Sequence, residues 1–142
     1  MKKNLFIILG FFLIIVAILV GIYFNTLKFT IIAQKNNKEY EQYTKNSILG
    51  SDLMTLINKA SNQNDKNNIE KDEKKYYIEN DTNSIKIEIK FLESDKTFNM
   101  ETISALGAEK FIKNYSKMTF KCTKIEYHKN TNNIKYMLFE QI

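Results

Sequence analysis

The hydrophobic pattern divides the chain into an apolar N-terminal stretch and a longer remainder of mixed polarity. Residues 5–24, LFIILGFFLIIVAILVGIYF, contain no charged side chain. As a helix, such a stretch spans about 30 Å, which matches the hydrocarbon core of a bilayer. The pattern therefore predicts a transmembrane helix over residues 5–24, preceded by a short cytoplasmic tail, residues 1–4.

A cleavable signal peptide is the alternative to a permanent anchor. The apolar region of a signal peptide is usually about 7–15 residues long and is followed by small residues at the cleavage site. Here the apolar run is longer, and the sequence that follows it, Asn25 to Lys28, has no such pattern. No cysteine lies near the segment, which excludes lipoprotein processing. We therefore expect an uncleaved anchor.

The lysines on the two sides of this segment bear on its orientation. Lys2 and Lys3 favour a cytoplasmic N-terminus, and three lysines that follow the segment weaken this bias. We expect the N-terminus inside the cell and the rest of the chain outside the membrane.

Residues 25–60 are predicted to form a helical stalk and a short second helix. No Pro or Gly interrupts the chain between Ile22 and Leu49, so the first helix is expected to continue over residues 25–49. Its amphipathic face recurs at alternating spacings of four and three, at Phe29, Ala33, Asn36, Tyr40, Tyr43 and Ser47. After Gly50, Ser51 or Asp52 can cap a second helix over Leu53 to Ala60.

Residues 61–75, SNQNDKNNIEKDEKK, are almost wholly polar and predict a solvated loop. A nucleic-acid-binding arm is the alternative. It is disfavoured because lysines and acids are mixed in this segment and the chain has no Arg, the residue on which base and phosphate contacts usually depend.

From residue 76 onward the hydrophobic period changes to two. Tyr76 to Glu79 and Ile85 to Phe91 are predicted to form a hairpin around the turn at residues 80–83. In the second run, isoleucines alternate with charged residues, which indicates one buried and one solvated face. Thr97 and Phe98 are expected to add a short edge strand.

The last third predicts one helix and two more strands. Asn99 can cap a helix over about residues 100–116, with Gly107 inside it. Strands follow at residues 119–128 and 134–139, and the alternation shifts between Cys122 and Ile125, which indicates a bulge. The predicted fold is α+β. A long N-terminal helix, transmembrane and then amphipathic, precedes a small domain, residues 76–142, with a four-stranded antiparallel sheet and one packed helix.

Composition limits the size and the chemistry of the protein. The 142 residues allow at most one ordinary domain. Lys, Asn and Ile, all with A/T-rich codons, dominate the chain and favour a low-GC bacterium as its source. A single Cys excludes an internal disulfide framework and a Cys-based zinc cluster, and a single His excludes multi-histidine metal sites.

The residues capable of catalysis do not form a recognisable motif. Cys122 and His128 lie on one predicted strand about 20 Å apart, too far for a nucleophile–base pair. We expect Cys122 to be a small buried apolar residue and His128 to lie on the surface. The remaining acids considered are scattered: Asp52, Glu101, Glu109 and Glu126. No glycine-rich phosphate-binding motif is present. We expect no enzymatic activity, no catalytic, cofactor-binding or metal-binding residues, no cofactor, no nucleic-acid partner and no small-molecule substrate.

The order of elements resembles that of type IV pilins and pseudopilins. In that family an apolar N-terminal helix continues as an amphipathic helix and is followed by an antiparallel sheet. The resemblance implies cleavage behind Gly10 and packing of the apolar helix in a filament core. Residues 5–9 are apolar where the family has a polar leader, and Ile15 stands where the family usually has Glu. Residues 48–58, ILGSDLMTLIN, are similar to a segment of small single-pass proteins in Gram-positive pilus or transfer systems.

Together these features predict a membrane-anchored structural or accessory subunit of a cell-envelope assembly. It would contact lipid through residues 5–24 and contact protein partners, or other copies of itself, through helix packing. The alternative is a membrane-tethered extracytoplasmic binding module that does not form filaments.

Overall fold

The computed structural model describes residues 2–94 and 96–142, without the side chains of residues 2–5 and 29. The chain divides into two compact units, Met1–Ile32 and Ala33–Ile142. Helix α1, Lys2–Thr44, contributes all the regular structure described for the first unit and supplies the first element of the second.

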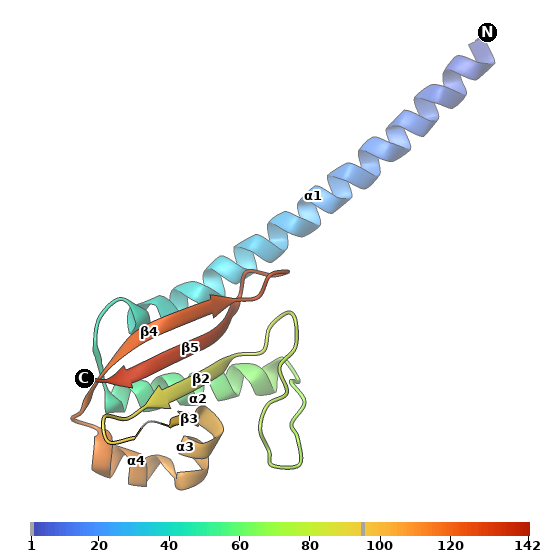
Figure 1. Ribbon diagram of the computed structural model, residues 1–142. Helices are drawn as coiled ribbons and strands as arrows, with labels where there is room; N and C mark the ends of the chain where they lie inside the picture. Colours follow the sequence, from blue (N-terminus) through green and yellow to red (C-terminus); the bar gives the residue numbers. More distant parts are fainter. Residues whose placement is uncertain (1, 95) are drawn as a thin grey trace. The chain divides into compact units, whose positions relative to one another are not determined.

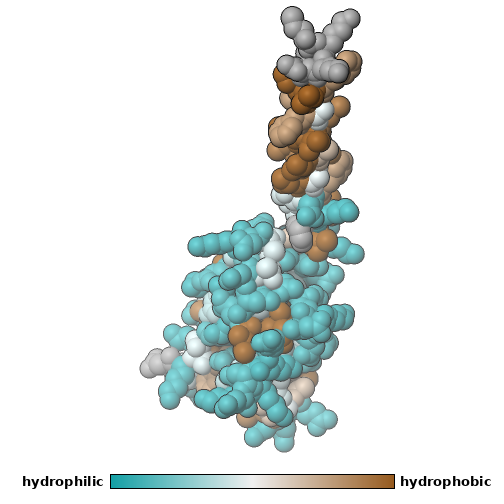
Figure 2. Space-filling model, turned by 90° about the vertical axis from the view of Figure 1, so that its right-hand side faces the viewer, coloured by the Kyte–Doolittle hydropathy of each residue, from teal (hydrophilic) through white to brown (hydrophobic). Residues whose placement is uncertain are grey.

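The first unit is a helix with an apolar surface. Between Phe6 and Phe24 the large hydrophobic side chains are 38–71% exposed, and Figure 2 shows this apolar surface along the helix. Among the described residues, α1 is the one helix long and apolar enough to cross a membrane. The prediction of a single long apolar N-terminal helix, compatible with membrane anchoring, is therefore confirmed.

The second unit combines a sheet with helices (Figure 1). Its elements after α1 are β1 (Ile48–Leu49), α2 (Gly50–Lys66), β2 (Lys86–Lys90), β3 (Thr97–Asn99), α3 (Met100–Leu106), α4 (Ala108–Tyr115), β4 (Thr119–Tyr127) and β5 (Ile134–Gln141). In the part of the chain that the structure describes, the sheet has five strands in the order β1-β4-β5-β2-β3. The α+β class is confirmed.

The predicted four-stranded antiparallel sheet is wrong, because β2 and β5 run parallel while the other neighbouring strands run antiparallel. The predicted hairpin partner of β2, Tyr76 to Glu79, is not a strand. The carboxylate of Asp72 accepts the backbone N–H groups of Lys74 and Tyr76 at 2.9 and 2.8 Å, which closes this segment into a turn of its own. β2 therefore pairs with β5 and with the predicted edge strand, β3.

The helix boundaries also differ from the predictions. α1 ends at Thr44 rather than at residue 49, because Ile48 and Leu49 pair with β4. The predicted helix over residues 100–116 breaks at Gly107, whose φ of 90° is incompatible with helical geometry. Asn99 holds the predicted N-cap position of α3, but its side chain makes no capping hydrogen bond.

α2 is longer than predicted, so residues 61–66 are helical and not part of a loop. Its buried side extends through the polar second half, because Ala60 and Asn64 continue the stripe begun by Leu53 and Ile57. Asp52 is not the cap of this helix, since Leu49 holds the N-cap position and Asp52 lies in the first turn.

The core lies on one face of the sheet. Ile87 and Ile89 of β2 and Met137 and Phe139 of β5 are fully buried there, together with the apolar face of α2. The predicted stripe on α1 contributes to the same core, since Tyr40 is buried in it and Tyr43 packs against it. Ala33 of the stripe is also buried. The predicted bulge is confirmed by the register shift between Cys122 and Lys124.

Candidate functional site

His128 and Cys122, the residues considered as a nucleophile–base pair, make different contacts in the structure. His128 is 3% exposed, so the prediction of a surface histidine is wrong. Its backbone forms both hydrogen bonds that close the turn before β5, and its ring Nε2 lies 2.7 Å from the carbonyl oxygen of Ser84. Cys122 is half-buried, and its thiol donates to the carbonyl oxygen of Lys124 at 3.5 Å. Burial raises the pKa of this thiol, which lowers its reactivity.

The four scattered acids lie on four different elements. Asp52 and Glu109 are exposed in the first turns of α2 and α4. Glu101 on α3 accepts the backbone N–H of Tyr77 at 3.3 Å, and Glu126 on β4 lies 2.6 Å from the ammonium of Lys124. Among the described residues, no group of three or more His, Cys, Asp or Glu side chains is arranged to hold a metal ion.

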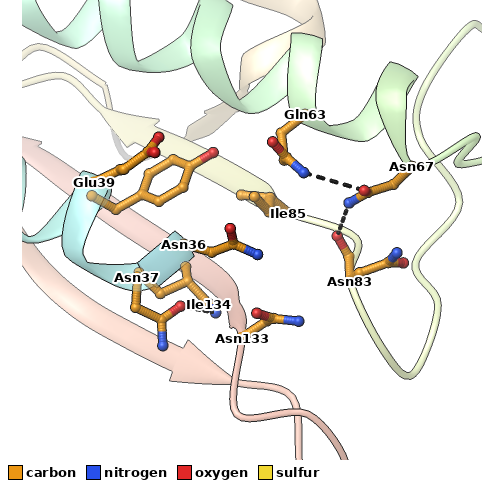
Figure 3. Close-up of a pocket in the computed structure, with 10 residues that line it drawn as sticks. Asn36, Asn37, Glu39, Gln63, Asn67, Asn83, Ile85, Asn133 and Ile134 are labelled. Carbon is orange, nitrogen blue, oxygen red and sulfur yellow. Dashed lines mark hydrogen bonds between the residues drawn. The ribbon is translucent and has the colours of Figure 1, made fainter. Parts of the chain in front are cut away.

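A polar pocket lies in the second unit between α1, α2 and the chain segments that enter β2 and β5 (Figure 3). Side-chain amides line most of it: Asn36, Asn37, Gln63, Asn67, Asn83 and Asn133. The Asn37 amide donates to the carbonyl oxygen of Asn132 at 2.7 Å and accepts the N–H of Ile134 at 2.9 Å. These bonds fasten the end of α1 to the start of β5.

Two polar atoms in this pocket are buried without a hydrogen-bond partner among the described residues, the hydroxyl of Tyr40 and Oδ1 of Asn133. Burial raises the pKa of Tyr40 well above its usual value, so the hydroxyl keeps its proton and can donate. The space open to solvent is about 20 Å³, enough for one water molecule that could bridge such atoms. The pocket suits a structural water and is too small for an organic substrate.

A larger, apolar groove lies between the loop after β2, α3 and α4, with a volume of about 450 Å³. We call it the aromatic groove. The Phe91 ring lies centrally in its aromatic cluster, with ring centroids 4.7 Å from Tyr115 and 5.5 Å from Phe98. Phe111 and Tyr115 reach the groove together because they are four residues apart on α4.

The rim of the aromatic groove is largely apolar and carries one charged side chain of each sign, Lys110 and Glu93. Leu92 and Leu106 line it and are 69% and 51% exposed. Lys113 lies one turn further along α4 than Lys110, and Lys117 lies in the turn after α4. Within residues 2–94 and 96–142, none of these lysines forms an ion pair.

Sequence reasoning did not identify this groove, because its aromatic residues lie in three different segments of the chain. The available signal was the pairing of Phe111 and Tyr115 with lysines in one short helix. The same pattern is found in an ordinary amphipathic helix. The break at Gly107 and the position of Phe91, which only the structure shows, distinguish a helix that lines a groove from such a helix.

Comparison with protein-family models, with curated proteins and with solved structures finds no match for this chain. The resemblance to type IV pilins stays a prediction.

Proposed function

We propose that the chain is a membrane-anchored structural or accessory subunit of a cell-envelope assembly, with its folded domain outside the membrane. The observation that carries the proposal is the exposed apolar surface of α1 between Phe6 and Phe24. A large apolar side chain left in water costs about 1.5–3 kcal/mol, so this surface would cost on the order of 20 kcal/mol or more. Lipid or the helices of other subunits must therefore cover it.

The pilin-like organisation is the finer part of this proposal. It is supported by the order of elements, in which the apolar helix continues as a helix that is part of the domain core through Tyr40 and packs against it through Tyr43. In such a subunit the apolar half of α1 would pack against other copies, and the domain would form the outer surface.

A membrane-tethered binding module is the second candidate function. The aromatic groove favours it, because apolar concavities of about 300–1,000 Å³ with a few polar groups are the usual form of binding sites. In this case α1 would be a permanent anchor, and the groove would hold an apolar part of the bound partner.

The N-terminus of the mature protein distinguishes the two candidates. We would measure the intact mass and the N-terminal peptide of the chain extracted from its native membrane. A chain that begins at Phe11, with an N-methyl group, would support the pilin-like subunit. A chain that still begins at Met1 would contradict prepilin-type processing and would support the tethered module.

A further inference from the structure

The aromatic groove presents an apolar surface beside a lysine-rich segment, residues 108–117, without a partner in the described chain. Its rim carries the exposed side chains of Leu92 and Leu106, with Glu93 as its one acid. The adjoining α4 carries Lys110 and Lys113, and Lys117 follows in the turn after that helix. An occupant that matches both features must bring an aliphatic side chain and acidic groups close together.

The segment over residues 69–81, IEKDEKKYYIEND, has this chemistry, and we call it the acidic loop. It contains five acids and three lysines. Ile78 is 48% exposed, although it lies between the half-buried Tyr77 and the acid Glu79. Glu70 and Glu73 are also exposed and form no ion pair within the described chain.

Backbone and side-chain bonds hold the acidic loop in one shape. The N–H of Ile78 donates to the carbonyl oxygen of Glu70 at 2.8 Å, and the N–H of Asp72 donates to the carbonyl oxygen of Tyr76 at 2.9 Å. The Tyr77 hydroxyl donates to the Asp65 carboxylate at 2.9 Å. A loop already ordered in this way loses little conformational entropy when it binds.

We propose that the acidic loop of one copy of this chain docks in the aromatic groove of a second copy. Ile78 fills part of the groove, and Glu70 and Glu73 lie beside the α4 lysines. The charges are complementary, since the loop carries an excess of acids, whereas residues 108–117 carry three lysines and one acid.

The loop and the groove occupy different surfaces of the same domain. The loop contacts α3 through Tyr76 at Thr102 and through Tyr77 at Glu101, whereas the groove is lined by Ile103 and Leu106 of that helix. Both surfaces of one copy can therefore be occupied at the same time. A contact between two different surfaces is head-to-tail and, unless a ring closes, it extends into an open assembly.

This inference names the partner in the proposed assembly, a second copy of the chain. It rests on the proposed function as a subunit of an assembly. The contact itself involves only the folded domain. Loss of this contact and loss of membrane anchoring can therefore be measured separately.

Cross-linking of the full-length chain in detergent micelles tests the contact. On a Cys122→Ala parent, one sample carries Ile78→Cys and a second, distinguishable by a tag, carries Leu106→Cys. We expect oxidation of the mixture to give a disulfide-linked heterodimer in at least about tenfold greater yield than the homodimers of either variant alone. Thr123→Cys, at an exposed β4 position, replaces Leu106→Cys in the matched control and should give little product.

Charge reversal gives an independent measurement on the same samples. Lys110→Glu with Lys113→Glu on the groove copy should lower the heterodimer yield about tenfold, and Glu70→Lys with Glu73→Lys on the loop copy should restore it. The inference is overturned if the mixture gives no more heterodimer than the Thr123→Cys control, or if charge reversal leaves the yield unchanged. Each variant is also checked for its partition into membranes, so that loss of the cross-link with retained membrane association refutes this contact alone.

Discussion

Asn64 and the backbone of Ile85 form a closed pair of hydrogen bonds in the interior of the domain. The side-chain amide of Asn64 donates to the carbonyl oxygen of Ile85 at 2.8 Å, and its Oδ1 accepts the N–H of Ile85, also at 2.8 Å. Asn64 is fully buried. This pair joins the second half of α2 to the segment that enters β2, and so fixes the strand that pairs parallel with β5.

Replacement of Asn64 by Ala should destabilise the domain strongly. The change leaves a buried N–H and a buried C=O of Ile85 without partners, and each costs about 1–3 kcal/mol. We expect a loss of about 2–4 kcal/mol in the free energy of unfolding. Thermal unfolding followed by circular dichroism in micelles measures it. Asn62→Ala, at an exposed position of the same helix, is the control and should change little.

Gly50→Ala tests the close approach of α2 to the end of α4. A Cβ atom at position 50 would lie 2.0 Å from the carbonyl oxygen of Tyr115, which is backbone and has little freedom to move. Overpacking of this kind costs about 1–3 kcal/mol or more. We expect a marked fall in the unfolding temperature. Ser51→Ala should be tolerated, and an equal loss in both variants would contradict a specific role for the glycine.

Glu88 should make part of the stability dependent on pH. Burial alone raises its pKa, but hydrogen bonds from Lys86 and from the Tyr136 hydroxyl outweigh burial and hold the pKa below the usual value of 4.5. A carboxyl whose pKa is lowered by folding contributes stability above its unfolded pKa and loses that contribution as the pH falls through the folded pKa.

The variant Glu88→Gln isolates this contribution. We expect it to be less stable than the wild type at about pH 6, with the difference shrinking toward about pH 3 as Glu88 becomes protonated. Unfolding midpoints at several pH values give the comparison. A constant difference over this range would show that the carboxylate charge is not the cause.

Cys122 should react slowly with thiol reagents in the folded protein. Its thiol is half-buried, its pKa is raised, and it donates to the Lys124 carbonyl oxygen. Because the thiolate is the reactive form, we expect labelling by a maleimide to be much slower than in the unfolded chain. The rate in native and denaturing conditions can be read by mass spectrometry, and similar rates would place the thiol at the surface.

Local periodicity predicted the parts of the fold that depend on neighbours in sequence. The alternation around Ile87 and Ile89 identified β2, the shift after Cys122 identified the bulge in β4, and the spacing of Ala33 and Tyr40 identified the packed face of α1. In each case the side-chain period alone determines which face is buried.

Long-range pairing was not predictable in the same way. Alternation is typical of antiparallel strands with one solvated face, and β2 alternates although it pairs parallel with β5, so its pattern pointed to the wrong pairing. The buried His128 was missed because its position depends on the turn that closes onto Ser84. The helical second half of α2 was missed because its buried residue there, Asn64, is polar. Extending the stripe from Ile57 and Ala60 by four more residues would have indicated it.

The aromatic groove could not be predicted from the sequence, because it also depends on contacts between segments that are distant in the chain. Phe91 follows β2, Phe98 belongs to β3 and Tyr115 to α4, and their rings form one cluster only in the folded domain. Each aromatic residue on its own is accounted for by packing within its element.

Membrane anchoring and the position of the folded domain can be measured together, by partition of the chain between membrane and soluble fractions and by protease added to intact protoplasts. We expect the full chain to stay in the membrane pellet after alkaline carbonate extraction, and we expect external protease to degrade its folded domain. Recovery of the full chain in the soluble fraction, with its apolar N-terminal helix retained, would contradict membrane anchoring. A domain that resists protease until the protoplasts are lysed would contradict its position outside the membrane.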